Sequence, residues 1–210
     1  MKTLISVSAG ALLTLSSLIA WARADDCVTW VSPLVVDLNR DGFVFGAPGA
    51  GVMFDLRADG TKDHMQWVRV QGDEGFLVLD LNSNGKVDDG SELFGEGTTL
   101  LLTGEKAGNG YIALAQYDMP EFGGNDDGKI SSADAIWPKL KIWLDLNADG
   151  KTQNGELKKL QASGITSLET IPKFRTVTDA AGNYMPMYSW VTTRQGQQMK
   201  MVDVFFQTLP

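Results

Sequence analysis

Cysteine and histidine are almost absent from this chain of 210 residues, which holds one of each, Cys27 and His64. A single cysteine excludes a disulfide scaffold, and one cysteine with one histidine is too few for a zinc site of the Cys/His type. The sequence also has no G-x-S-x-G elbow, no P-loop and no dinucleotide-binding fingerprint. We therefore predict that the protein is not a conventional enzyme.

Positive charge is also scarce. The chain has 18 Lys and Arg residues against 26 Asp and Glu residues, for a net charge of −8. Binding to nucleic acid or to an anionic membrane needs clustered cations, so neither partner is expected. Hydrophobic residues make up 43% of the sequence, which is enough for a folded core.

The amino end has the pattern of an export signal. Lys2 precedes an apolar stretch over residues 4–20, and Ala22-Arg23-Ala24 places small residues at both positions of an A-x-A cleavage site. This order is typical of a secretory signal peptide. The alternative, an uncleaved membrane anchor, is less favoured because the stretch is short and contains many Ser and Thr residues. We expect a secreted or periplasmic protein with a signal peptide at 1–24, a linker at 25–32 and a folded module at 33–210.

One phrase, Asp-x-Asn-x-Asp/Asn-Gly, recurs after apolar runs. It occurs at Asp37–Gly42, Asp80–Gly85 and Asp145–Gly150, with variants at Asp55–Gly60 and Asn125–Gly128. Calcium takes about six to eight oxygen ligands, and side chains at alternate positions of a tight loop converge on such an ion. A glycine at the sixth position permits the positive φ of a sharp turn. The repeat predicts several EF-hand-like loops with Ca²⁺ as the cofactor.

The loop that begins at Asp145 matches the whole EF-hand pattern. Numbered from that residue, its ligands are Asp145, Asn147 and Asp149 at positions 1, 3 and 5, the Lys151 carbonyl at 7, and Glu156 at 12. A metal-free Asx turn is the alternative, but such a turn needs no carboxylate six residues after its glycine. The amphipathic stretch at 157–160 predicts an exiting helix that stops near Gly164.

Two further loops match less completely. The first offers Asp80, Asn82, Asn84, the Lys86 carbonyl and Asp88, and its closing carboxylate, Glu92, falls one place late, which predicts a bulged closure. The second offers Asn125, Asp127, the Lys129 carbonyl and Asp134. Its first position falls on a glycine, so either Asp118 or Glu121 would have to complete it. Helix capping by Asp134 is an equally open interpretation.

The remaining two loops lack essential ligands. Asp37, Asn39 and Asp41 supply three oxygens, but no closing carboxylate follows. In the Asp55 loop, Arg57 stands at position 3, where its charge would repel a cation. Each is either a site completed from elsewhere in the fold or a metal-free turn, and the turn is favoured for Asp55.

The coarse structure is predicted to be α+β, with short strands and a C-terminal hairpin around short helices that carry the calcium loops. The helices are expected over 111–163, beside the metal loops. Runs rich in Val, Leu, Ile and Phe predict the strands, which are placed at 33–38, 51–56, 65–70, 76–81, 165–171, 184–193 and 198–206.

The order of these motifs resembles a known family. The most specific parts are the stretch 79–96 and the Asp145 loop. They are similar to the calcium-binding modules of bacterial haemolysin-type and RTX-associated secreted proteins, and most of all to the FrpC-like self-processing module. The resemblance implies that calcium folds the module and triggers cleavage of an Asp-Pro bond at its amino end. In that reaction the Asp carboxylate attacks its own carbonyl, and a Lys amine can capture the resulting anhydride.

The matching dipeptide in this chain is Ser32-Pro33, which lacks the carboxylate. Two main hypotheses follow. In the first, the chain is a secreted calcium-binding module with a structural or recognition role toward a protein or a cell-surface polymer. In the second, it is a calcium-triggered module that cleaves or ligates itself at Ser32-Pro33. A hydrolase that uses calcium only structurally is a third, weaker hypothesis.

Overall fold

The computed structural model describes residues 31–47 and 49–210. The expected signal peptide at 1–24, Cys27 and most of the expected linker lie outside the described residues. The strands are β1 (Leu34–Asp37), β2 (Gly51–Phe54), β3 (Asp63–Gln66), β4 (Glu74–Leu79), β5 (Lys129–Ser131), β6 (Leu140–Trp143), β7 (Leu157–Lys159), β8 (Ile165–Glu169), β9 (Lys173–Thr178), β10 (Tyr184–Thr193) and β11 (Gln198–Phe205).

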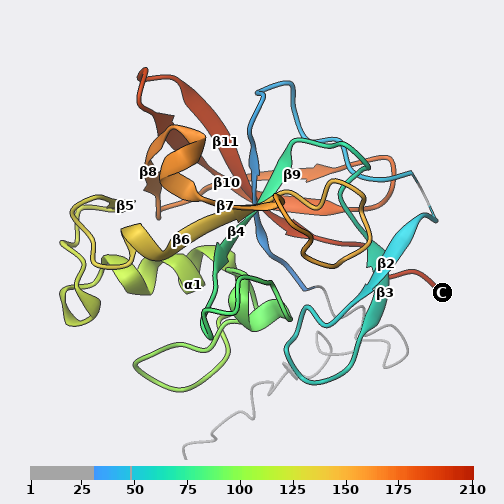
Figure 1. Ribbon diagram of the computed structural model, residues 1–210, viewed down its shortest axis with the longest axis horizontal. Coiled ribbons are helices and arrows are strands. Elements are labelled where there is room, and N and C mark those ends of the chain that lie inside the picture. Colours follow the sequence, from blue (N-terminus) through green and yellow to red (C-terminus); the bar gives the residue numbers. More distant parts are fainter. Residues whose placement is uncertain (1–30, 48) are drawn as a thin grey trace, which may run out of the picture.

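Nine of these strands form one curled antiparallel sheet. Its order is β5-β8-β10-β11-β1-β4-β6-β7, with β9 paired to the first half of β10. The first strand, β1, lies between β11 and β4 near the centre of the sheet (Figure 1). The first and last strands of the described chain are therefore paired with each other. Strands β2 and β3 form a separate hairpin.

The central strands are buried on both faces. Along β1, Leu34 and Val36 enter one hydrophobic cluster while Val35 enters the other. On β4, Leu77 faces the first cluster and Phe76 the second. Successive side chains of a strand point to opposite faces, so a run of apolar residues places a core on each side of the sheet.

A different layer covers each face. The only α-helix of the described residues, α1 (Gly110–Ala115), contributes Tyr111 and Leu114 to the first cluster. The β2–β3 hairpin and the loop after it contribute Met65 and Trp67 to the second cluster. In Figure 1, α1 and this hairpin lie on different sides of the central strands.

The predicted α+β class is wrong, because the fold is mostly β. The expected helical region, 111–163, holds α1 but also β5, β6 and β7, joined by short 3₁₀ turns. The expected exiting helix after Glu156 is strand β7, which pairs with β6 and is followed by a 3₁₀ turn at Leu160–Ser163. The helical spacing of apolar residues at 157–160 covers less than two turns, which is too short to outweigh pairing with the edge of β6. Gly164, the expected helix stop, instead ends this 3₁₀ turn, with φ at +76°.

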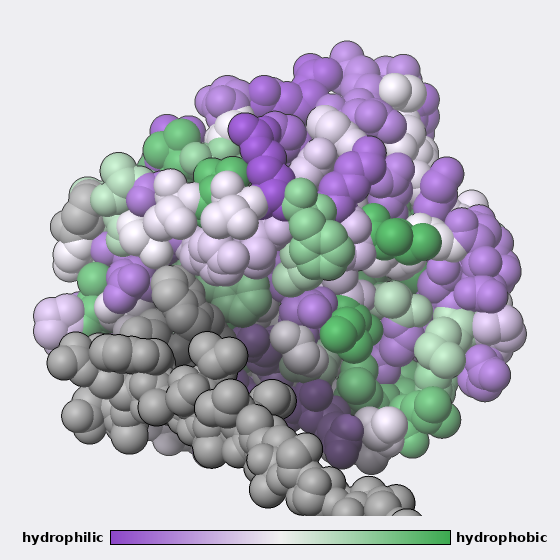
Figure 2. Space-filling model, turned by 180° about the vertical axis from the view of Figure 1, so that it is seen from behind, coloured by the Kyte–Doolittle hydropathy of each residue, from purple (hydrophilic) through white to green (hydrophobic). Residues whose placement is uncertain are grey.

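The described part of the chain contains no helix long and apolar enough to cross a membrane. On the face shown in Figure 2, hydrophobic side chains lie in small groups among hydrophilic ones. The most exposed large apolar residues include Phe174 and Leu102.

Candidate metal centres

The five loops share one backbone conformation. Apart from Gln71, every described non-glycine residue with positive φ stands at the fourth position of a loop: Arg40, Ala58, Ser83, Asp126 and Ala148. The glycine at the sixth position is also at positive φ in every loop: Gly42, Gly60, Gly85, Gly128 and Gly150. Positive φ is uncommon for residues other than glycine. Its recurrence shows that the repeated sequence encodes a repeated structure.

In the Asp145 loop, the first carboxylate organises the turn. Asp145 accepts hydrogen bonds from the backbone N–H groups of Asp149, at 3.2 Å, and Gly150, at 2.7 Å. Glu156 closes the loop by accepting from the N–H groups of Leu146 and Gln153, at 2.9 and 2.8 Å. The structure therefore brings positions 1 and 12 to the same loop, as the sequence predicts.

The side chains between these ends also converge. The Gln153 amide donates to Asp149 at 2.8 Å, and Asn147 is hydrogen-bonded to the same carboxylate. Burial works against the ionisation of Asp149, but these two hydrogen bonds, together with the N–H and the charge of Lys151, lower its pKa. The N–H of Lys151 also donates to Asp149, at 2.9 Å. The oxygen of the Gln153 amide is buried and has no hydrogen-bond partner, as fits a group placed to face a cation.

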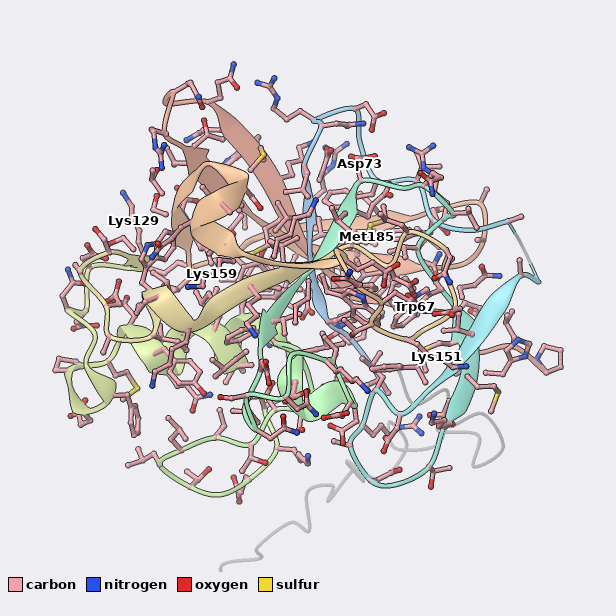
Figure 3. All side chains as sticks on the ribbon, in the orientation of Figure 1. Trp67, Asp73, Lys129, Lys151, Lys159 and Met185 are labelled. Atoms are coloured by element: carbon pink, nitrogen blue, oxygen red, sulfur yellow. The ribbon has the colours of Figure 1, made fainter. Side chains whose placement is uncertain are left out.

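Asp145 is tied to the core through Trp67. The indole Nε1–H donates a buried hydrogen bond of 2.7 Å to the Asp145 carboxylate. Trp67 packs against Phe76 and Phe206 with ring centroids 4.7 and 5.4 Å apart. Figure 3 shows Trp67 near the loop that carries Lys151. Burial raises the pKa of Asp145, while the hydrogen bonds from Gly150 and Trp67 lower it only in part.

The Asp80 loop has the bulged closure that the sequence predicts. Glu92 accepts from the N–H groups of Leu81, at 2.9 Å, and Asp88, at 3.0 Å. These are positions 2 and 9, the same two positions that Glu156 binds in its own loop. The 3₁₀ turn Gly90–Glu92 takes up the additional residue.

The middle ligand candidates of this loop meet at one carboxylate. The side-chain amides of Asn82 and Asn84 donate to Asp88 at 2.8 and 2.7 Å, and the N–H of Lys86 donates to Asn84 at 2.8 Å. Asp80 accepts from the Lys141 ammonium at 2.6 Å. Burial raises the pKa of Asp80, but Lys141 and the loop amides together bring it below its usual value.

The two most complete loops lie side by side. The N–H of Val87, at position 8 of the Asp80 loop, donates to the hydroxyl of Thr152 at 2.9 Å. Thr152 is at position 8 of the Asp145 loop. This hydrogen bond therefore links the two loops at the same position of each.

In the Asn125 loop, Asp118 takes the first position. It accepts from the N–H groups of Asp127 and Gly128, at 3.3 and 2.8 Å, as the first residue does in the other loops. Asp134 accepts from Ser131 at position 9, and its other oxygen is buried without a partner. Asn125 donates to Asp127 at 3.1 Å, and the N–H of Lys129 donates to the same side chain at 3.0 Å. Of the two candidates from the sequence, the structure selects Asp118 and leaves Glu121 exposed.

The Asp37 loop is completed from another strand. Asp37 accepts from Gly42 at 3.0 Å, and Asn39 accepts from Asp41 at 2.8 Å. Asp73, just before β4, accepts from the N–H of Asn39 at 3.2 Å, and Glu74, the first residue of β4, accepts from the N–H of Val44 at 2.7 Å. The ligand atoms of Asp37, Asp41 and Asp73 all lie within 4.8 Å of one another.

Sequence reasoning missed Asp73 and Glu74 as members of this site. The signal that could have found them is the acidic pair at the start of an apolar run, although which loop it serves depends on strand pairing. Asp37 and Glu74 face each other in the β1–β4 register. Burial raises the pKa of Glu74 despite its hydrogen bond from Val44.

The Asp55 loop holds a cation of its own. The Arg57 guanidinium lies 2.6 Å from the carboxylate of Asp63, at position 9 of the loop. Asp55 nevertheless accepts from Asp59 and Gly60 at 3.1 and 2.8 Å, so the turn is the same as in the other loops. The guanidinium occupies the side-chain positions that would otherwise serve a metal, which fits the metal-free turn.

The loops account for almost all the buried acidic residues of the described chain. The exception is Asp203. Glu74 reaches the Asp37 loop from β4, and the others stand at a first or closing position: Asp37, Asp55, Glu92, Asp118, Asp134, Asp145 and Glu156. Burying a carboxylate without a compensating cation is costly. The donor set consists of carboxylates, amides and backbone carbonyls, which are the oxygen ligands of a hard cation such as calcium.

A family model described as "SPM domain" matches residues 34–207. The chain belongs to the SPM domain family. It is also 40% identical over 174 residues to "Iron-regulated protein FrpA" of Neisseria meningitidis serogroup C. The match covers 82% of this chain but 15% of that relative, so the chain spans a small part of the protein it is similar to.

The SPM match begins directly after the Ser32-Pro33 junction. Ser32 is fully buried, and its N–H donates to Glu96 at 3.1 Å. Burial raises the pKa of Glu96 to about 7, the Ser32 hydrogen bond opposes this, and the nearby Asp203 adds to it. Burial also raises the pKa of Asp203 to about 6, although the Ser32 side chain and the Gly110 N–H lower it. The Ser32 hydroxyl and the Asp203 Oδ1 atom are both buried, and neither forms a hydrogen bond of good geometry. The interaction of the Ser32 side chain with Asp203 is therefore poorly aligned.

Proposed function

We propose that this SPM chain is a calcium-binding module that is secreted or periplasmic and whose fold is consolidated by the ion. Its role is structural or in recognition, toward a protein or a cell-surface polymer, rather than catalytic. One observation carries the proposal: the first and closing carboxylates of the Asp145 loop, Asp145 and Glu156, are both buried and repel each other, and a bound cation would offset that repulsion. Extracellular calcium modules function with dissociation constants of about 10⁻⁴–10⁻³ M.

The test is calcium titration of residues 25–210 by calorimetry, followed by thermal melts in calcium and in chelator. We expect two or more bound ions and a large rise in melting temperature, because an ion that binds only the folded state stabilises it. The double variant Asp145→Asn with Glu156→Gln keeps the shapes of both side chains but removes both charges. It should bind one ion fewer and show a smaller rise.

Glu105→Gln is the matched control, since Glu105 is exposed and lies outside the loops. It should behave as the wild type does. If the wild type shows neither heat nor a shift in melting temperature, the loops are metal-free turns and the proposal fails.

Self-cleavage at the Ser32-Pro33 junction is a second candidate, favoured by the hydrogen bond that the N–H of the buried Ser32 donates to Glu96. Water would attack the Ser32 carbonyl carbon and form a C–O bond there. The bond from that carbon to the Pro33 nitrogen would break, and this nitrogen would leave with a proton from Glu96, which the attacking water would replace. A gel of the chain incubated with and without calcium tests this: a single stable band in calcium rejects self-cleavage.

A further inference from the structure

A hollow of about 520 Å³ opens over strands β10 and β11, and none of the residues that line it belongs to the Asp80 or Asp145 loop. Its floor comes from the middle of β10 and β11, through Tyr188, Trp190 and Val202. Strand β9 forms one wall, and the segment after the Asp37 loop, with Phe43, forms another. Met185, labelled in Figure 3, also lines it.

The floor presents two aromatic rings. Tyr188 and Trp190 point to the same face of β10 and are half-buried, while the residues between and beside them are buried in the core. Their ring centroids are 6.1 Å apart and the planes are at 88°. Because the planes are at right angles, one ring can lie face-on to a ligand while the other meets it edge-on. Each ring also carries a polar atom at its edge, which suits the mixed apolar and hydroxylated faces of a sugar.

Two cations stand at the edge of the same hollow. Arg175 on β9 and Lys200 on β11 are exposed, and neither forms an ion pair with a described residue. Lys200 is directly opposite Trp190 in the β10–β11 register. The one acid that lines the hollow, Asp179, already accepts from the N–H groups of Ala181 and Asn183, both at 2.9 Å.

We propose that this hollow binds an acidic oligosaccharide, with one ring of the Tyr188–Trp190 pair under a sugar ring, the other ring against its edge, and Arg175 and Lys200 on a carboxylate. Charge complementarity selects the ligand: on a chain of net charge −8, two cations beside an aromatic floor favour an anion with an apolar face. A peptide fits less well, because the backbone groups of β10 and β11 at the floor are already paired with each other.

The site is linked to the proposed calcium function at one point. Gly42 and Phe43, positions 6 and 7 of the Asp37 loop, line the hollow. An ion in that loop would fix the wall that Phe43 forms. Calcium dependence of saccharide binding therefore rests on the proposed function, while the saccharide site itself does not.

The experiment is calorimetric titration of the chain, in calcium and in chelator, with 3′-sialyllactose and a hyaluronan tetrasaccharide. Lactose and chitotetraose are the neutral controls, and hexaglutamate represents an acidic protein segment. Arg175→Ala and Lys200→Ala should each weaken binding of the acidic sugars by about tenfold, the value of one charge-assisted contact. Lys159→Ala, an exposed lysine on β7 at the opposite edge of the sheet, should not change it.

Trp190→Ala should abolish binding, and its melting temperature shows whether the fold survives. The proposal is overturned if neither acidic sugar binds, if the neutral sugars bind equally well, or if hexaglutamate binds more tightly than the sugars. Calcium binding without saccharide binding removes this inference alone. Saccharide binding that depends on Arg175 but not on calcium, in a chain that binds no calcium, supports the inference and overturns the proposed function.

Discussion

Ser32 stands where the resemblance places a reactive aspartate. A hydroxyl at this position cannot form the anhydride, so we expect the wild type to stay intact in calcium. Ser32→Asp restores the Asp-Pro dipeptide next to the same buried surroundings. We expect this variant to release a fragment of residues 33–210 when calcium is added, visible on a denaturing gel.

Ser32→Asn is the control, because it has the shape of aspartate without the carboxylate. It should remain a single band. An uncleaved Ser32→Asp variant that still binds calcium would show that the junction lacks more than one carboxylate.

Gly124 illustrates how a single residue allows Asp118 to enter its loop. A Cβ at this position would lie 2.1 Å from the carbonyl carbon of Asp118, so the backbone would have to move. Gly124→Ala should lower the free energy of unfolding by about 1–3 kcal/mol and weaken calcium binding at this loop. Denaturant unfolding and calorimetry would measure the two effects.

Gly108→Ala is the matched control, since its nearest neighbour outside the adjacent residues is a side-chain carbon of Ile112 at 3.8 Å. It should change neither quantity. Equal effects of the two variants would contradict a specific role for Gly124.

At the scale of elements, Lys141 on β6 would compete with calcium for Asp80. The Lys141 ammonium on β6 lies 2.6 Å from Asp80, where an ion would have to displace it. Lys141→Met should therefore raise calcium affinity at this loop by about two- to fivefold, the value of a modest ion pair. Calorimetry would detect the change.

Lys139→Met, which removes an exposed lysine two residues away, should leave the affinity unchanged. A fall in affinity with Lys141→Met would mean that Lys141 positions Asp80 for the ion instead of competing with it.

At the scale of the whole molecule, the buried acids make stability depend on pH. In the folded chain the pKa of Glu96 is raised from 4.5 to about 7 and that of Asp203 from 3.8 to about 6, chiefly by burial. Between these values the folded state holds more protons than the unfolded state. Stability is therefore greatest at the acid end of this range and falls as the pH rises.

We expect the melting temperature in chelator to fall by several degrees from pH 5 to pH 7.5 for this reason. Glu96→Gln should reduce the slope, while Glu105→Gln, an exposed site, should not. A melting temperature that rises over this range would contradict the raised pKa values.

The sequence predicts the position of most strands because their apolar runs are long enough to identify. The hairpin strand 184–193 is confirmed, and the runs near 33–38, 51–56 and 165–171 contain β1, β2 and β8. The sequence does not predict β5, β6 and β7. These short strands form because neighbouring strands offer open edges for pairing. The sequence also does not predict β9, whose residues are exposed throughout and carry no burial pattern.

The turn conformation of the Asp37, Asp55, Asp80 and Asp145 loops was determined by the sequence itself. An aspartate five residues before a glycine folds back onto the intervening N–H groups, and all the contacts lie within one short segment. The Glu92 and Glu156 closures are local in the same sense. Local contacts of this kind need no knowledge of the rest of the fold.

Only the tertiary structure decided what completes the other loops. Glu74 reaches the Asp37 loop because β1 pairs with β4, and Trp67 reaches Asp145 from 78 residues away. The hollow between β9, β10 and the Asp37 loop likewise depends on strand order. Strand pairing is set by burial of both sheet faces, a property of the whole core that no single segment encodes.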